Sequence, residues 1–156
     1  FAALAAAALT GAVGAVHLDR PVQGSSSVSA SIQSSAASEV VRLTNSARSQ
    51  NGYAALVEDG ALSEAAAVRA REIARSFSHT RPSGASFSSA LSESGVSYLR
   101  AGENIASGQK SAFEVVNAWM NSPGHRANIL NSSYSRIGSA SVNIDGTLYW
   151  VQLFAD

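Results

Sequence analysis

After residue 38, apolar residues recur every three or four positions, the spacing of helices with one buried face. Ser111 and Glu114 have the spacing of a capping box, and Ser122-Pro123 is typical of the start of a further short helix. With Gly and Asn as stop signals, the pattern predicts four longer helices. Their ranges are Ser38–Gln50, Leu62–Ser76, Ser86–Ser94 and Ser111–Asn121.

The helix predicted over Leu62–Ser76 is amphipathic. Ala65, Ala66 and Ile73 indicate its buried face, and Arg69 is assigned with the other charged residues to its solvent face. This assignment leaves no charged side chain of the helix in the core.

The period changes from helical to alternating near the C-terminus. Arg136–Ile144 and Thr147–Phe154 alternate in polarity and flank Asp145-Gly146, a dipeptide typical of a tight β-hairpin. Helices followed by a terminal hairpin predict an α+β domain in which helices pack on an antiparallel sheet.

Phe1–Val16 is apolar or small throughout and carries no charge. It is shorter than the roughly 20 residues of a membrane-spanning helix. It resembles the apolar region of a secretory signal, with Val13-Gly14-Ala15 as a candidate cleavage site. An Ala-rich helix and a truncated anchor are the alternatives. We therefore treat residues 1–22 as a signal-like or anchor segment.

Residues 23–38 are rich in serine and nearly free of large apolar groups. Such a composition predicts a flexible linker, because too little surface can be buried to offset chain entropy. The folded domain is therefore expected over residues 39–156.

Composition narrows the classes of function. Eleven basic and eleven acidic side chains cancel, so charge gives no reason to expect a nucleic-acid partner. Charged residues make up only 14% of the chain, and 28 serines take their place on the surface. The absence of cysteine excludes disulfides, thiolate catalysis and cysteine-ligated zinc.

Three histidines and one carboxylate are the candidates for chemistry. His17 lies beside the candidate cleavage site and has no assigned role. His79 and His125 each lie just outside a predicted helix, and Glu103 lies between them in a weakly polar segment. From the residues alone, the two histidines either fix loop backbone or bind a ligand.

Three blocks, FSHTRP, GENIA and NAWMNSPGHRANIL, occur in this order. With them the chain resembles the bacterial branch of the CAP superfamily, which comprises cysteine-rich secretory, antigen 5 and pathogenesis-related 1 proteins. These are also called SCP-like extracellular proteins. The resemblance covers about Val40–Phe154 and implies a three-layer α-β-α sandwich with a central antiparallel sheet and an open cleft.

The resemblance also implies a set of cleft residues. His79 matches the family's first histidine, Glu103 the glutamate of its GEN motif, and His125 its second histidine. Several members bind a divalent metal through the histidine pair, so zinc or another divalent metal is the candidate cofactor. The family's second glutamate corresponds to Ser122, which leaves three of the four residues. Further residues expected to line the cleft are Asn104, Ser122, Arg81 and Arg126.

The helix start beside His125 adds an electrostatic expectation. If Ser122 is the N-cap, the positive end of the helix dipole disfavours the imidazolium, and His125 stays neutral. Two histidines and at most one carboxylate leave coordination positions open to water, which predicts an accessible metal site of modest affinity.

The favoured interpretation is a secreted or surface-attached binding module, not an enzyme, whose partner is a small molecule, lipid or protein. It would meet a membrane only through the N-terminal segment. The alternative is a zinc-dependent hydrolase of peptidase or esterase type, with Glu103 as general base. The chain has no HExxH, GxSxG or cysteine nucleophile to support it. A structural module anchored by residues 1–22 is a third hypothesis.

Overall fold

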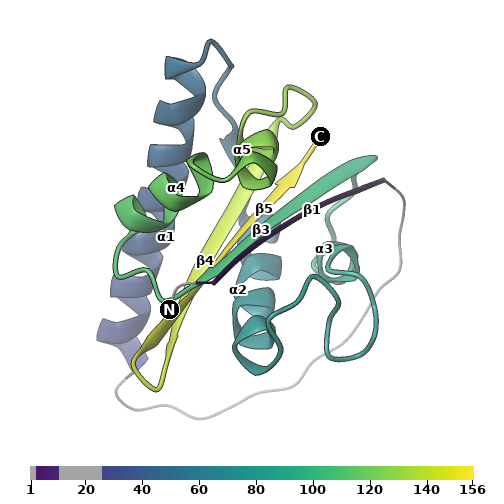
Figure 1. The fold of residues 1–156 in the computed structure, drawn as a ribbon. Helices are drawn as coiled ribbons and strands as arrows, with labels where there is room; N and C mark the ends of the chain where they lie inside the picture. Colours follow the sequence, from purple (N-terminus) through teal and green to yellow (C-terminus); the bar gives the residue numbers. More distant parts are fainter. Residues whose placement is uncertain (1–2, 11–25) are drawn as a thin grey trace.

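A computed structural model describes residues 3–10 and 26–156. At its centre lies a five-stranded sheet with the strand order β1-β3-β5-β4-β2 (Figure 1). Neighbouring strands are antiparallel except β2 and β4, which form a two-residue parallel pair. The strands are β1 (Ala3–Thr10), β2 (Val57–Glu58), β3 (Arg100–Ser107), β4 (Arg136–Ile144) and β5 (Thr147–Ala155).

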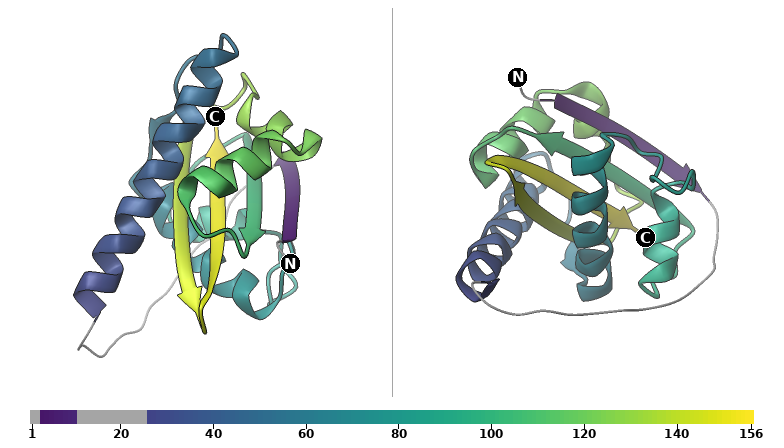
Figure 2. Two further views of the ribbon diagram at one scale, coloured as in Figure 1. Left: turned by 60° about the vertical axis from the view of Figure 1, so that its left-hand side comes forward. Right: turned by 90° about the horizontal axis from the view of Figure 1, so that it is seen from below.

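Helices cover both faces of this sheet. α1, α4 and α5 lie on one face, and α2 and α3 lie on the other (Figures 1 and 2). The α+β class and the predicted three-layer α-β-α sandwich are therefore confirmed. The helices are α1 (Ser26–Gln50), α2 (Gly60–Arg75), α3 (Ser88–Glu93), α4 (Ala112–Met120) and α5 (Pro123–Ile129).

Alternation along the central strands divides the core into two layers. Ile105 of β3 and Val151 of β5 belong to the cluster under α2 and α3, while their neighbours Ala106 and Trp150 belong to the cluster under α1 and α4. β3 and β5 are therefore apolar on both faces. Consecutive residues of β3 reach opposite helical layers, which decides where the residues of the GENIA block point.

The hairpin turn and the start of α4 lie where the local sequence signals predict them. Asp145 and Gly146 both have positive φ, as a tight two-residue hairpin turn requires. The Ser111 hydroxyl accepts a hydrogen bond from the backbone N–H of Glu114 at 3.1 Å, as in the predicted capping box. The Glu114 carboxylate accepts from the Lys110 N–H instead of the Ser111 N–H. α2, α3 and α4 begin and end within two residues of their predicted bounds.

The start of α1 differs from the prediction. The helix begins at Ser26 instead of Ser38, so the prediction of a flexible linker is wrong over Ser26–Ser38. No Gly or Pro interrupts this stretch, and its Ala and Gln residues favour helix. Extending a helix from an end that is already packed costs much less than nucleating a new one.

The N-terminal segment contributes a strand. Ala3–Thr10 pairs with β3, so the alternative of an Ala-rich helix is wrong for these residues. The candidate cleavage site and His17 lie outside the described residues. The signal or anchor role of residues 1–22 stays a prediction. None of the described helices combines the length and apolar character that crossing a membrane would require.

Gly138 tests how closely α2 approaches the sheet. A Cβ at this position would lie 2.2 Å from the carbonyl carbon of Leu62 and 2.3 Å from the amide nitrogen of Ser63. We expect Gly138→Ala to lower the free energy of unfolding by about 1–3 kcal/mol, because backbone must move to admit the methyl group. Chemical denaturation measures the change.

Gly60→Ala is the matched control, since a Cβ at Gly60 meets nothing within 4 Å. It should leave the stability unchanged or raise it by up to about 1 kcal/mol. Equal effects of the two substitutions would contradict the close approach of α2 to β4.

Candidate functional site

Glu103 is a fully buried carboxylate in the middle of β3. Alternation points its side chain toward α2, where Arg69 is also fully buried. Arg69 Nε donates to Glu103 Oε2 at 2.7 Å, and Arg69 Nη2 donates to Oε1 at 3.1 Å. The assignment of Arg69 to the solvent face of its helix is therefore wrong. The assignment followed the charge of Arg69, although its spacing from Ala65 and Ile73 places it on the buried face of α2.

His79 follows α2 and completes the contacts of this carboxylate. Its Nδ1 lies 2.8 Å from Glu103 Oε1, and Arg69 Nη2 donates at 2.6 Å to the carbonyl of Ser78, one residue earlier. The buried Nε2 of His79 has no hydrogen-bond partner in the described part of the chain. The contact of Nδ1 therefore orients the ring, and Nε2 is available to bind a ligand.

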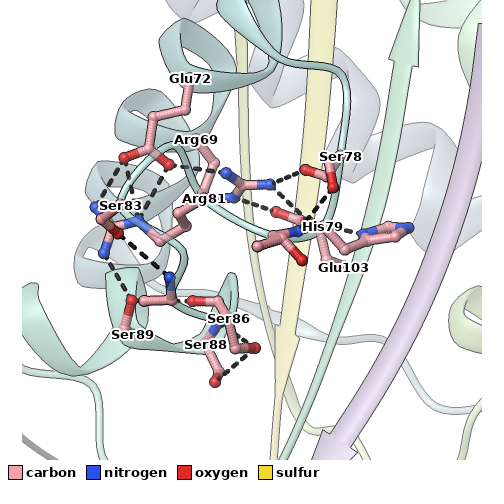
Figure 3. A network of polar contacts seen from close by, with 12 residues as sticks. Arg69, Glu72, Ser78, His79, Arg81, Ser83, Ser86, Ser88, Ser89 and Glu103 are labelled. Carbon is pink, nitrogen blue, oxygen red and sulfur yellow. Dashed lines mark hydrogen bonds and ion pairs between the residues drawn. The ribbon is translucent and has the colours of Figure 1, made fainter.

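Arg69 also begins an ion-pair network that extends away from the sheet (Figure 3). Arg69 donates to Glu72 at 2.8 Å, Glu72 binds Arg81, and Arg81 binds Glu93 at 2.7 Å. Burial would raise the pKa of Glu72, but hydrogen bonds from Arg81 and Arg69 outweigh it and hold the pKa below its ordinary value. Arg81 thus fixes the loop that carries His79.

A second cluster of hydrogen-bonded polar residues lies on the opposite face of β3. The Asn104 amide donates to the His125 carbonyl at 3.2 Å and to Gln152 Oε1 at 3.1 Å. Asn128 donates to Asn104 Oδ1 at 3.0 Å. All four residues are buried. These bonds hold α5 against the sheet and thereby set the position of His125.

His125 is 4% exposed, and its Nδ1 lies 2.6 Å from the Ser122 hydroxyl. Burial lowers the pKa of His125, the Ala5 backbone partly offsets this, and nearby His79 lowers it further. The direction agrees with the expected neutral ring, but its largest cause is burial and not the helix dipole. Within the described residues its Nε2 also lacks a hydrogen-bond partner, so the Ala5 contact does not satisfy it.

The residues predicted to line the cleft fall into two groups. Asn104 and Ser122 both contact His125. Ser122 occupies the N-cap position of α5 but makes no side-chain capping bond. Arg81 is held by Glu72 and Glu93, and Arg126 donates to the exposed side chain of Asn51 at 3.1 Å. In the structure, both arginines therefore bind residues other than His79 and His125.

Sequence reasoning missed three residues that position the site: Arg69, Asn128 and Gln152. Asn128 carries the clearest signal, because it follows His125 by three positions and so shares its helix face. Gln152 lies at a core-facing position of the predicted hairpin, where a buried amide needs partners. Arg69 carries a signal as well, because it lies four positions after Ala65 and four before Ile73, within the apolar stripe of the helix.

Comparison with known proteins identifies the family to which this chain belongs. Residues 41–154 match the family "CAP: Cysteine-rich secretory protein family". The chain belongs to this family, although it has no cysteine. The match covers the described domain from α1 to β5 and leaves out β1.

Individual relatives agree with this membership. The chain is 42% identical over 118 residues to the uncharacterized protein YkwD of Bacillus subtilis (strain 168), covering 74% of this chain and 45% of that protein. It therefore spans less than half of that relative's length.

Two solved structures are similar to this chain. The first is an extracellular protein containing a SCP domain from Bacillus anthracis str. Ames, with a TM-score of 0.75, 25% identity, and coverage of 88% of this chain and 45% of that one. The second is an outer surface protein from Borrelia burgdorferi, with a TM-score of 0.66, 24% identity, and coverage of 75% of this chain and 89% of that one. At 24% identity, the similarity to the second structure is one of fold alone.

The buried Arg69–Glu103 pair predicts a large loss of stability when one partner is removed. We expect Arg69→Met to lower the free energy of unfolding by about 3–5 kcal/mol, because Glu103 would stay buried without its cation. The double variant with Glu103→Gln should lose less than the sum of the single variants. Urea denaturation of all three measures the coupling.

Arg42→Met is the control for this cycle. Arg42 pairs with Glu39 at the surface, where solvent screens the pair, so stability should be nearly unchanged. An additive double variant at residues 69 and 103 would contradict the buried pair.

The lowered pKa of His125 predicts a pH dependence of stability. Because the neutral ring is favoured in the folded state, its contribution is fully present above the ordinary value of about 6.5. It is lost as the pH falls from there toward the lower folded pKa. We expect the chain to be less stable at pH 5.5 than at pH 7.5, and His125→Gln to reduce this difference. His17→Gln is the control, and an unchanged difference in His125→Gln would contradict the prediction.

Proposed function

We propose that this domain is an extracellular ligand-binding module whose ligand is held between His79 and His125. The observation that carries the proposal is the pair of buried Nε2 atoms without partners among the described residues. Both Nδ1 atoms are held, one by Glu103 and the other by Ser122. The two rings are also close enough that His79 affects the pKa of His125.

Unsatisfied buried nitrogen atoms favour a ligand that would satisfy them. A buried polar atom without a partner costs about 1–3 kcal/mol, and native proteins contain few of them. Two on neighbouring rings would be satisfied together by one polar group or one cation. The chain would therefore gain stability on binding such a ligand.

A divalent cation such as zinc fits part of this arrangement. Metal-bound imidazoles are usually oriented by a carboxylate on their other nitrogen, as Glu103 orients His79. Within residues 3–10 and 26–156, no three His, Asp or Glu side chains are grouped to share an ion. His79 and His125 would thus be the only protein ligands supplied by this site, and water or an external group would complete the coordination.

The contacts of Glu103 argue against the hydrolase alternative. A general base needs a free lone pair directed at the water it deprotonates. Arg69 and His79 contact both oxygens of this carboxylate, and Glu103 is fully buried, so it does not face a water molecule in solvent. Its role in the proposal is to hold His79.

The proposed location rests on the relatives. One solved relative is described as extracellular and the other as an outer surface protein. By this likeness we place the domain outside the cell, secreted or attached to the surface. Its partner would be a small molecule, a lipid or a protein, and the balanced charge gives no reason to propose nucleic acid.

Zinc titration by calorimetry tests the histidine pair. At pH 7.5 we expect one zinc ion per chain with micromolar affinity, weakening at pH 5.5 because protons compete for the imidazoles. His79→Ala and His125→Ala should each weaken binding at least tenfold. His17→Ala is the matched control and should bind as the unchanged chain does. Binding that survives both substitutions would remove His79 and His125 from the proposed site.

A further inference from the structure

The outer edge of β3 holds a strand that lies outside the matched family domain. β1 pairs with β3 over eight residues, from Ala3 opposite Ser107 to Thr10 opposite Arg100. In Figure 2 this strand runs along the edge of the sheet beside α5. Without β1, β3 would present a row of unpaired backbone groups, which is the template for adding another strand.

β1 adds to the domain without forming its centre. Ala5 and Ala7 are half-buried and pack against the cluster under α2 from outside, and Ala3, Leu4 and Ala8 are exposed. The family match begins at residue 41. β1 thus lies outside the matched domain and packs at the edge of the sheet.

The site accepts only small side chains at alternate positions. Ala5 and Ala7 face the cluster under α2, and Ala6 faces α5. A Cβ added to Gly124 would lie 3.6 Å from the Cβ of Ala6, which is already van der Waals contact. A larger side chain at position 6 or at Gly124 that pointed across this gap would have no room.

Side chains of α5 contact the backbone of the occupant. Asn128 donates to the carbonyl of Ala7 at 3.2 Å, while it also contacts β3 through the Glu103 carbonyl at 3.3 Å. The Ala5 backbone lies beside the His125 ring. Recognition therefore combines strand pairing with the Asn128 amide, and it favours small side chains at the centre of the occupant, Ala5 to Ala7.

We infer that the β3 edge beside His125 is a binding site for an extended, uncharged peptide with small side chains at its centre, and that β1 is its intramolecular occupant. This rests on the proposed binding function and names the ligand class. A peptide in another protein would pair with β3 when β1 is displaced. Because β1 belongs to the same chain, it competes with such a peptide and controls access to β3.

The test uses the full chain with β1 displaced. Ala5→Asp with Ala7→Asp puts charges against the apolar cluster and should eject β1. The matched control carries the same substitutions at Ala12 and Ala15, outside β1. The probe is a fluorescent peptide of sequence ALAAAALT flanked by lysines. By fluorescence anisotropy, the displaced variant should bind it with micromolar affinity, and the control and unchanged chain at least tenfold more weakly.

A second pair of variants tests the contribution of Gly124 in α5 to peptide binding. In the displaced chain, Gly124→Leu should weaken peptide binding at least tenfold, whereas Gly124→Ala should change it less than twofold. A peptide of sequence ALDADALT should not bind. Absence of binding to the displaced variant, or binding unaffected by Gly124→Leu, would overturn the inference.

Measurements of folding, oligomeric mass and zinc binding distinguish the remaining explanations. Circular dichroism should show the displaced variant folded, and unfolding would overturn the inference because β1 would then be part of the core. A dimeric mass of the full chain that becomes monomeric in the displaced variant would assign the strand to a second copy, which also overturns it. Zinc binding in the displaced variant without peptide binding would overturn only this inference. Loss of both would remove the proposed function as well.

Discussion

The buried ion pair between Arg69 and Glu103 is the interaction on which the rest of the site depends. A carboxylate inside a sheet must have a cation and hydrogen bonds to offset its desolvation, and Arg69 supplies both from α2. The same guanidinium binds the Ser78 carbonyl and Glu72, so it fixes the loop that follows α2. His79 is placed by this loop and by Glu103 together. The pair therefore connects the core of the fold to the orientation of one imidazole.

Strand alternation explains how two histidines from opposite layers reach one edge. Glu103 and Asn104 are consecutive in β3, so one points toward α2 and the other toward α5. Glu103 holds His79 on its side, and Asn104 holds the backbone of His125 on the other. Among the described residues, both rings keep one nitrogen occupied and one without a partner. Two adjacent residues thus position the two halves of the site from within one strand.

The edge location also connects the histidines to strand pairing. β3 separates the residues that hold the two rings, and β1 occupies the remaining side of β3. A ligand that satisfies the imidazoles and a peptide that pairs with β3 would meet at the same place. Small side chains along β1 permit this closeness, because α5 approaches Ala6 at Gly124. Binding and strand addition therefore depend on the same positions of α5.

The sequence alone determined the local elements and the α+β class, and the resemblance to the CAP superfamily related His79, Glu103 and His125 as candidates. Helical periodicity, the capping residues and the Asp145-Gly146 turn act over a few neighbouring residues, so they can be interpreted from the chain directly. It did not determine that Arg69 is buried, that α1 starts at Ser26, or that Ala3–Thr10 forms a strand. These depend on partners far away in the sequence: Arg69 lies 34 residues from Glu103, and β1 pairs with residues about a hundred positions later. Only the tertiary structure brings such partners together, because burial and strand pairing are decided by long-range packing that local pattern does not encode.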